Sequence, residues 1–400
     1  MPRPVHMPMI MPPDAGTPAR KPRVCFSLLF AEQLLNGSGG YFGGAEVRGV
    51  TFLRGIAQDQ ALDVHVMVVG HAVPRPSCMR PDGITVHYRP DACFYQGNQD
   101  DVRQSVWAQV YVAFGANAAT AELARFCTAH GSALVVSVAS DLSLAPFVHE
   151  FSTIADPYGV PGHFIWHGMR HADELVVQTE HQRERVRTCV QREATLIRNP
   201  TPSGVLTAPR MAPRYGGRML WIGCIDPNKR HQEALILAAA SPHRPMIMVC
   251  NNIHTLGAGV INELQQQLPN LVLADQVALP DIDALFRFSD VLVNTSVVEG
   301  FPNTFLQAGM HGIPVVSMVV DPDGMLTTCG CGRVSDDTRN GMAQTVEMLL
   351  QSKPAYAAAA AANAGWLRSR HDPAGRIEEL SVVVHRALAL RARRAVAHVS

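Results

Sequence analysis

The stretch EGFPNTFLQAGMHGIPVVS, Glu299 to Ser317, combines a turn, a helical segment and the start of an apolar strand. Another apolar run, VLVNTS at 291–296, comes just before it, so the order is strand, turn, helix, strand. Pro302 suits the first position of a helix, where the N–H that proline lacks has no partner. A carboxylate followed by helix N-terminal amides can hold hydroxyl and phosphate groups together. The turn is therefore a candidate ligand site, and a plain strand-to-helix turn with a surface glutamate is the structural alternative.

Apolar runs alternate with helical segments along most of the chain. Strands that alternate with helices at this spacing predict parallel sheets with helices on both faces. The apolar runs lie at residues 23–30, 64–70, 84–88, 108–115, 133–140, 174–179, 194–200, 218–224, 245–250, 271–275, 291–296, 313–318 and 332–335. We therefore expect an α/β fold with doubly wound, Rossmann-like units.

A segment rich in proline, glycine and serine near Arg198 interrupts this alternation and indicates a linker. Four hundred residues also suit two hydrophobic cores better than one. We expect an N-terminal domain over residues 23–200 and a C-terminal domain over 201–371, facing each other across a cleft. The Pro-rich residues 1–22 are expected to be flexible, and a helix at about 372–395 is expected to complete the first domain.

The composition argues against several classes of protein. With 34 basic and 34 acidic residues the net charge is zero, so we expect no nucleic-acid partner. The sequence shows no signal-peptide pattern and no apolar run of spanning length, and its nine cysteines are scattered. We therefore expect a cytoplasmic protein. The basic and apolar residues at 385–394 add the hypothesis of peripheral contact with the inner face of a membrane.

Five motifs of the chain belong together: EGFPNTFLQ at 299–307, GGAE at 43–46, WIGCIDPNKR at 221–230, FSDVLVNTS at 288–296 and HDP at 371–373. They resemble those of glycosyltransferase family 4, the retaining GT-B enzymes also called glycosyl transferases group 1. The resemblance covers about residues 23–390. It implies the GT-B fold and a metal-independent hexosyltransferase or related enzyme. It also implies a nucleotide diphosphate sugar as donor substrate, no cofactor, and an unknown glycan, lipid-linked or small-molecule acceptor in polysaccharide or glycoconjugate synthesis.

The resemblance assigns roles to single residues. Glu299 matches the glutamate that contacts the donor sugar, and Lys229 matches the lysine that neutralises the leaving diphosphate, so these two are the predicted catalytic residues. Ser140 and Asp141 are predicted on the acceptor side, although either also suits a helix cap. The other predicted donor contacts are Gly43, Gly44, Gly223, Gly300, Phe301, Pro302, Asn303, Thr304 and Gln307.

Some positions depart from the family pattern. Gln307 replaces a glutamate that usually holds the ribose hydroxyls, so we expect weaker or altered nucleotide binding. Cys224 replaces an arginine, which removes one cation near the diphosphate, and Arg230 is a candidate substitute. Residues 139–141 replace a segment that carries a histidine in many family members. The departures keep a catalytically weak or silent sugar-nucleotide-binding protein or partner subunit open as an alternative.

A nucleotide-sugar epimerase or a sugar phosphorylase of the same fold is a second alternative, distinguished by its product. No metal site is expected, because DPD at 321–323 and CGC at 329–331 lack companion ligands at the usual spacing. The histidines form no HExxH pattern either.

Overall fold

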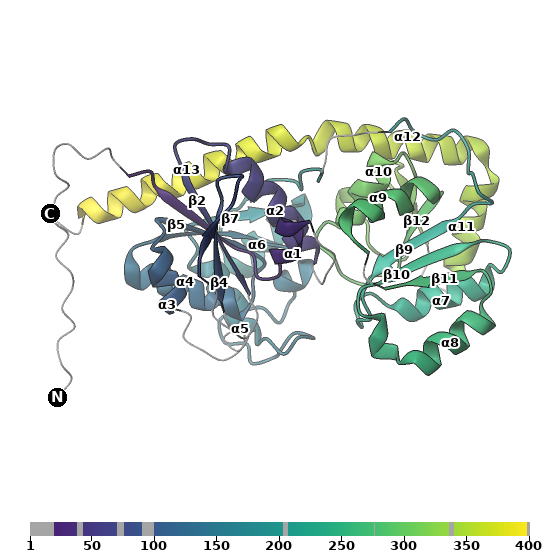
Figure 1. The fold of residues 1–400 in the computed structure, drawn as a ribbon, viewed down its shortest axis with the longest axis horizontal. Coiled ribbons are helices and arrows are strands. Elements are labelled where there is room, and N and C mark those ends of the chain that lie inside the picture. Colours follow the sequence, from purple (N-terminus) through teal and green to yellow (C-terminus); the bar gives the residue numbers. More distant parts are fainter. Residues whose placement is uncertain are drawn as a thin grey trace.

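Two α/β domains and a long C-terminal helix make up the computed structural model (Figure 1). The structure describes residues 20–37, 43–69, 76–89, 100–202, 207–275, 277–335 and 340–397. The segment 1–22, predicted to be flexible, lies outside the described residues as far as position 19. Among the described helices, none is long and apolar enough to cross a membrane.

The first domain is built on a sheet that, in the described residues, has eight strands in the order β3-β4-β2-β1-β5-β6-β7-β8. Neighbouring strands are parallel except for β3 and β4. The strands are β1 (Arg23–Ser27), β2 (Asp63–Val69), β3 (Cys78–Met79), β4 (Thr85–Arg89), β5 (Val110–Phe114), β6 (Ala133–Ser137), β7 (Glu174–Val177) and β8 (Thr195–Leu196). The helices are α1 (Glu32–Asn36), α2 (Gly44–Ile56), α3 (Asp100–Val106), α4 (Ala118–His130), η2 (Asp141–Leu144), α5 (Gly162–Arg170) and α6 (Glu180–Val190).

The second domain contains a parallel sheet that, in its described part, has six strands in the order β11-β10-β9-β12-β13-β14. The strands are β9 (Met219–Gly223), β10 (Met246–Cys250), β11 (Leu271–Ala274), β12 (Val291–Asn294), β13 (Val315–Ser317) and β14 (Gly332–Val334). The helices are α7 (His231–Ala240), η3 (Ile253–Leu256), α8 (Ala258–Gln267), α9 (Leu279–Phe288), α10 (Asn303–Met310), η4 (Pro322–Gly324), α11 (Gly341–Gln351) and α12 (Lys353–Arg370).

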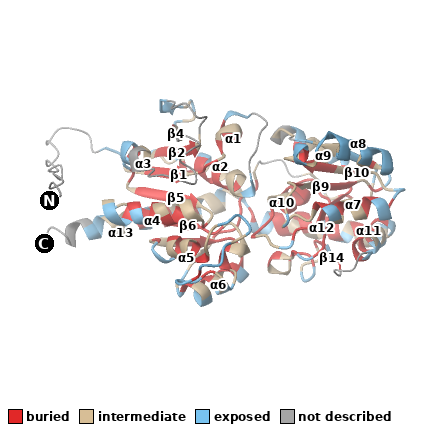
Figure 2. Ribbon diagram, turned by 90° about the horizontal axis from the view of Figure 1, so that it is seen from below, coloured by how far each residue is buried: buried red, intermediate tan, exposed pale blue. Residues whose placement is uncertain are grey.

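Both sheets are covered by helices, so their central strands are buried on both faces (Figure 2). In β5, for example, Val110, Tyr111 and Val112 are all fully buried. This explains why the strands appear in the sequence as continuous apolar runs and do not alternate with polar residues.

Strand order determines where loops gather. In the second sheet the order reverses between β9 and β12, and in the first it reverses between β1 and β5. Ligands of open parallel sheets bind beyond the carboxyl ends of the strands at such a reversal. The loops after β9 and β12 carry Lys229 and Glu299, and the loop after β1 leads to Gly43 and Gly44.

The final helix, α13 (Pro373–Ala397), returns to the first domain, where it contacts α2, β5 and β6. Figure 1 shows it lying along the first domain, while α12 lies along the second. Its buried residues Leu380, Val383, Val384 and Ala387 follow the helical spacing of one apolar face and join the core of the first domain. Gly55 permits this approach, because a Cβ there would come within 2.5 Å of the Ile377 side chain.

The chain passes from one domain to the other twice, near Asn199 and at His371. These two connections meet at the buried His371 side chain. His371 follows α12, and its Nδ1 donates a hydrogen bond to the carbonyl oxygen of Asn199 at 2.6 Å. Thr201 N donates to His371 O at 3.1 Å, so the two crossings bind each other in both directions. The rings of Phe301 and Trp366 lie 4.9 and 4.7 Å from the imidazole ring. The turn that follows Glu299 is therefore packed directly on the junction between the domains.

Acid should weaken the fold through this histidine. Burial lowers the pKa of His371 from 6.5 to about 3. Between these two pH values the histidine is protonated in the unfolded chain and neutral in the folded chain. The free energy of unfolding should therefore fall by about 1.4 kcal/mol per pH unit from His371 alone as the pH drops. Urea unfolding between pH 7 and pH 4 should show a shallower pH dependence in His371→Gln than in the wild type. An equally steep dependence in that variant would contradict this, and His149→Gln, an exposed histidine, serves as the matched control.

Candidate functional site

The predicted catalytic residues are in contact. Lys229 Nζ and Glu299 Oε1 form a salt bridge, and their side chains are 28% and 17% exposed. Burial alone would lower the pKa of Lys229, but the adjacent Glu299 carboxylate outweighs it and the pKa is raised. Lys229 is therefore protonated, and it pairs with the carboxylate that the resemblance places at the donor sugar.

Asn228 joins the two loops that carry this pair. Its Nδ2 donates to Val298 O at 2.8 Å, and Val298 N donates back to its Oδ1 at 2.9 Å. Thr295 Oγ1 also donates to Lys229 O at 2.6 Å. These bonds hold the loops that follow β9 and β12 against each other. Sequence reasoning missed Asn228, because its partners lie 70 residues away and no local pattern indicates them.

The turn after Glu299 docks on the first domain. Asp141 N donates to Glu299 O at 3.1 Å. A Cβ on Gly300 would lie 2.4 Å from Ala139 O and 2.7 Å from Gln178 Nε2, so only glycine fits without a shift. The loop after β6 and the turn at Glu299 and Gly300 therefore touch across the cleft. This contact brings Asp141, predicted on the acceptor side, next to Glu299.

The start of α10 makes further contacts between the domains. Asn303 Nδ2 donates to Gly44 O at 2.7 Å, and Asn303 Oδ1 accepts from Asn199 Nδ2 at 2.9 Å. Phe301 is buried, and its ring stacks on Trp366 with centroids 5.5 Å apart. Contact of Asn303 and Phe301 with a donor therefore remains a prediction that rests on the turn's backbone, because both side chains have structural partners.

The glycine loop of the first domain faces this turn. Gly43 N donates to Glu46 Oε2 at 3.1 Å, which caps the start of α2. Burial raises the pKa of Glu46. Gly44 and Asn303 are joined as described above, so the GGAE segment and the Glu299 turn meet across the cleft. Residues 38–42, which precede this segment, lie outside the described residues.

A cavity of about 570 Å³ lies between the domains, beside Glu299. Glu299 and Gly300 line it from the second domain, and Asp141, His181 and Arg185 line it from the first. Burial raises the pKa of Asp141 to about 6; its bond to Gln182 and the charge of His181 work against the rise, while Glu299 and Asp323 add to it. Asp141 thus changes charge near neutral pH at the edge of the cavity. Ser140 has a capping role, since its Oγ accepts from Leu142 N at 3.2 Å.

The DPD carboxylates are already bonded to protein groups. Asp323 accepts from Glu180 N at 2.9 Å and from Arg198 Nη1 at 2.6 Å, and Arg198 and Asp323 are each 8% exposed. Asp321 accepts from Leu326 N at 2.7 Å. Across the described residues, no group of three or more His, Cys, Asp or Glu side chains is arranged to hold a metal ion. Asp323 instead links the two domains through its bonds to Arg198 and Glu180, which the sequence motif did not indicate.

The departures from the family pattern have physical consequences. Burial, and then the nearby Asp226, raise the pKa of the Cys224 thiol, so it stays neutral. A thiol also has no cationic form that could replace an arginine. Arg230 Nη2 donates to Glu233 Oε1 at 3.0 Å, so its charge is already paired within its own helix. Gln307 lies in α10 and is 6% exposed. Gly223 lies under the ring of Trp221, which a Cβ would approach to 2.6 Å.

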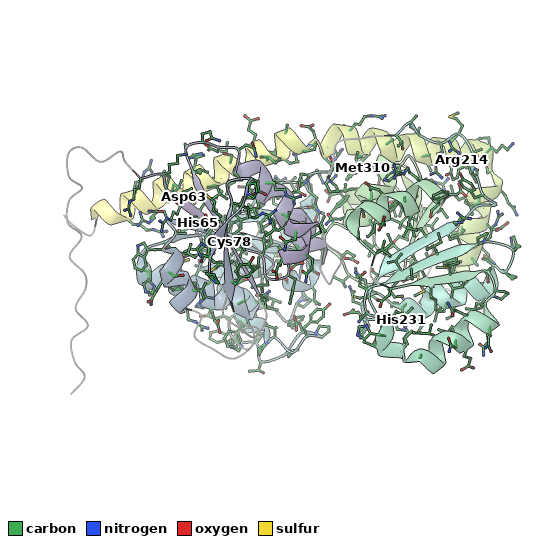
Figure 3. The ribbon with its side chains drawn as sticks, in the orientation of Figure 1. Asp63, His65, Cys78, Arg214, His231 and Met310 are labelled. Carbon is green, nitrogen blue, oxygen red and sulfur yellow. The ribbon has the colours of Figure 1, made fainter. Side chains whose placement is uncertain are left out.

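A chain of titratable side chains lies elsewhere in the first domain. His65 Nδ1 and His87 Nε2 are 2.8 Å apart, and His87 Nδ1 lies 2.8 Å from Ser77 Oγ. Asp63 Oδ2 lies 3.1 Å from the other nitrogen of His65. Figure 3 shows Asp63 and His65 in the first domain, apart from His231 in the second. Burial lowers the pKa of His87 to about 4, so this imidazole is neutral near pH 7 and joins β4 to β2.

Known structures resemble the whole chain. Anabaena HepE in complex with UDP and glucose has a TM-score of 0.65 and 14% identity, over 91% of this chain and 99% of that one. Sucrose-phosphate synthase from Thermosynechococcus elongatus has a TM-score of 0.71 and 10% identity, over 92% and 100%. WaaG, a glycosyltransferase involved in lipopolysaccharide biosynthesis, has a TM-score of 0.62 and 14% identity, over 90% and 99%. These similarities show the fold.

Sequence comparison adds a family match. Residues 216–352 match the model of the family described as Glycosyl transferases group 1, and no curated protein matches the chain. The matched region contains both Lys229 and Glu299. The chain therefore has the two-domain GT-B fold, and its second domain carries a glycosyl transferases group 1 region.

Proposed function

We propose that this protein is a metal-independent, retaining glycosyltransferase that moves a sugar from a nucleotide diphosphate sugar to a glycan or lipid-linked acceptor. The observation that carries the proposal is the Lys229–Glu299 pair beside the cavity between the domains. The known HepE structures, which contain UDP or UDP-glucose, support a nucleotide-sugar donor. Polysaccharide or glycoconjugate synthesis on the cytoplasmic side is the proposed setting.

The geometry gives each residue a task. A bound diphosphate attracts the Lys229 ammonium, and the Glu299 carboxylate is then free to accept hydrogen bonds from sugar hydroxyls. Asn303 and Thr304 begin α10, where a helix leaves its first N–H groups without partners inside the helix and carries a partial positive charge. Lysine and helix amides together stabilise the negative charge that grows on the leaving diphosphate. The salt bridge thus keeps both side chains in place until the donor arrives.

Retention is implied by the resemblance to glycosyltransferase family 4, and it is part of the proposal. In the proposed mechanism the leaving phosphate oxygen takes the acceptor's proton on the same face of the sugar, so no covalent nucleophile is required. Contact between the domains excludes water, which otherwise competes as an acceptor. Asp141 N already donates to Glu299 O across the cleft, and Gly300 lies against Ala139 O, which supports closure at this point.

A second candidate is a catalytically weak or silent sugar-nucleotide-binding protein or partner subunit. The neutral Cys224 thiol and the paired Arg230 favour it, because they leave Lys229 without a second free cation at the end of β9 among the described residues. Restoring Cys224→Arg and Gln307→Glu together separates the two candidates. A large gain in turnover supports a weakened enzyme, and a loss shows that the present residues suit their own donor.

The sharpest test of donor binding is isothermal titration of UDP, GDP, ADP, dTDP and their sugars, without added metal. We expect one nucleotide family to bind and to bind more weakly to Lys229→Ala, because the ammonium no longer neutralises the diphosphate. Lys353→Ala, an exposed lysine in α12, is the matched control. No binding of any nucleotide would count against the proposed function.

Removing either member of the salt bridge should also impair transfer. We expect Glu299→Ala and Lys229→Ala each to lower kcat/KM by about 100-fold or more, since each loses a group that acts on the transition state. The double variant should lose less than the product of the two effects, because the residues act as a unit. Transfer is measured as nucleotide release, with thermal unfolding to confirm folding. Turnover close to wild type in either single variant would contradict the assignment.

Asp141 should impose a pH dependence on transfer. Its carboxyl group, with a pKa of about 6, is half ionised near that pH, so an anionic Asp141 that accepts a hydrogen bond from a sugar hydroxyl is present above it and lost below it. We expect kcat/KM to rise between about pH 5 and pH 7, and Asp141→Asn to flatten this rise. Asp281→Asn, which changes an exposed carboxyl group of α9 outside the cavity, is the control. A wild-type slope in Asp141→Asn would exclude this role.

A further inference from the structure

A second hollow lies on the first domain. Its volume is about 690 Å³, and it is lined by residues of α4, of α5, of the segments before and after α5, and by Gln191 at the end of α6. It shares no lining residue with the cavity beside Glu299. We call it the α5 groove; its lining is Arg125, Glu150, His163, Phe164, Trp166, His167, Arg170, His171 and Gln191. Figure 2 shows α5 beside α6 at one edge of the first domain.

The charge of the α5 groove favours an anion. Arg125 and Arg170 are exposed, and within the described residues neither guanidinium forms a salt bridge. Glu150 supplies the acidic group of the lining. Burial lowers the pKa of His167, and the neighbouring His171 and Arg125 lower it further. Unpaired guanidinium groups bind carboxylates with two parallel hydrogen bonds.

The histidines add hydrogen-bonding groups of fixed orientation. His163 Nδ1 donates to Ser152 O at 2.7 Å, and His171 Nδ1 donates to His167 O at 3.0 Å. Each neutral imidazole therefore carries its proton on Nδ1 and leaves Nε2 as an acceptor. Such an acceptor suits a hydroxyl group, which can donate to it. Within the described residues these histidines form no metal site with other ligands.

Aromatic rings complete the lining. Arg125 lies over the ring of Phe164, 5.7 Å from its centroid, and the His163 ring lies 4.4 Å from the same ring. Trp166 is half-buried, with one part packed on the core of the first domain. A flat ring of this kind offers an apolar surface with polar groups at its rim. It suits the C–H face of a sugar ring, whose hydroxyls point outward from that face.

From these three features together we propose that the α5 groove binds an acidic sugar chain, one whose sugar rings carry carboxylates. The arginines pair with the carboxylates, the histidine Nε2 atoms accept from hydroxyls, and the aromatic rings pack on the sugar faces. An acidic peptide lacks the rigid apolar ring face. The site is separate from the donor cleft, so the inference does not depend on the proposed transfer reaction.

The test is isothermal titration with a hexamer of galacturonic acid at about 150 mM salt, where exposed charges are screened beyond about 8 Å. We expect Arg125→Gln combined with Arg170→Gln to raise the Kd by about tenfold or more, because two charge-assisted contacts are lost. The matched control is Arg183→Gln combined with Arg187→Gln in α6, which removes the same charge outside the groove. Trp166→Leu should also weaken binding, and it keeps an apolar side chain against the core. Thermal unfolding checks that each variant is folded.

Further ligands show which chemical feature of the hexamer is recognised. Maltohexaose tests the carboxylates, hexaglutamate tests the sugar rings, and a thymidine hexanucleotide tests stacking of bases. We expect all three to bind at least about tenfold more weakly than the galacturonate hexamer. Lys229→Ala should bind the acidic hexamer as the wild type does, even if nucleotide binding fails. No binding of that hexamer, equal binding of any of the three, or equal loss in the control variant would overturn the inference.

Discussion

The hydrogen bond from His371 to Asn199 O is the constraint on which the arrangement of the two domains depends. The chain passes between the domains near both residues, so the bond ties the two connections to each other. Phe301 packs on the same histidine. Burial lowers the pKa of His371 and keeps the imidazole neutral, which a ring surrounded by aromatic and arginine side chains requires. The packing of Phe301 on His371 thus helps to fix the position of the turn that follows Glu299.

Contacts across the cleft extend this constraint to the site. Arg198 binds Asp323, and Asn303 bonds to both Asn199 and Gly44, so one side of the cleft is closed by direct bonds. The cavity beside Glu299 borders these contacts, since Asp323 is one of its lining residues. A donor that enters there meets groups whose separation is already defined, which reduces the entropy lost on binding. The Lys229–Glu299 salt bridge holds the two charges at the same place before the donor binds.

The departures from the family pattern are consistent with a site whose electrostatics have changed. A neutral Cys224 leaves the charge at the end of β9 to Lys229, and Gln307 removes an anion from α10. Asp141, in the segment where many family members carry a histidine, adds a carboxyl group whose pKa is about 6. Relative to the family pattern, the site therefore has one cation fewer at position 224, one anion fewer at position 307 and one carboxyl group more at position 141.

The sequence by itself determined the two α/β domains and the loops that carry Glu299, Lys229 and the glycine pair. Side-chain periodicity, proline at a helix start and glycine in turns are local properties, so they can be recognised without knowledge of the partners. Only the tertiary structure decided that Asp323 ties the domains to Arg198, 125 residues away, that Asn228 joins two strand ends, and that Arg125 faces the rings of α5. Such contacts depend on which strands become neighbours, and no local pattern encodes that order.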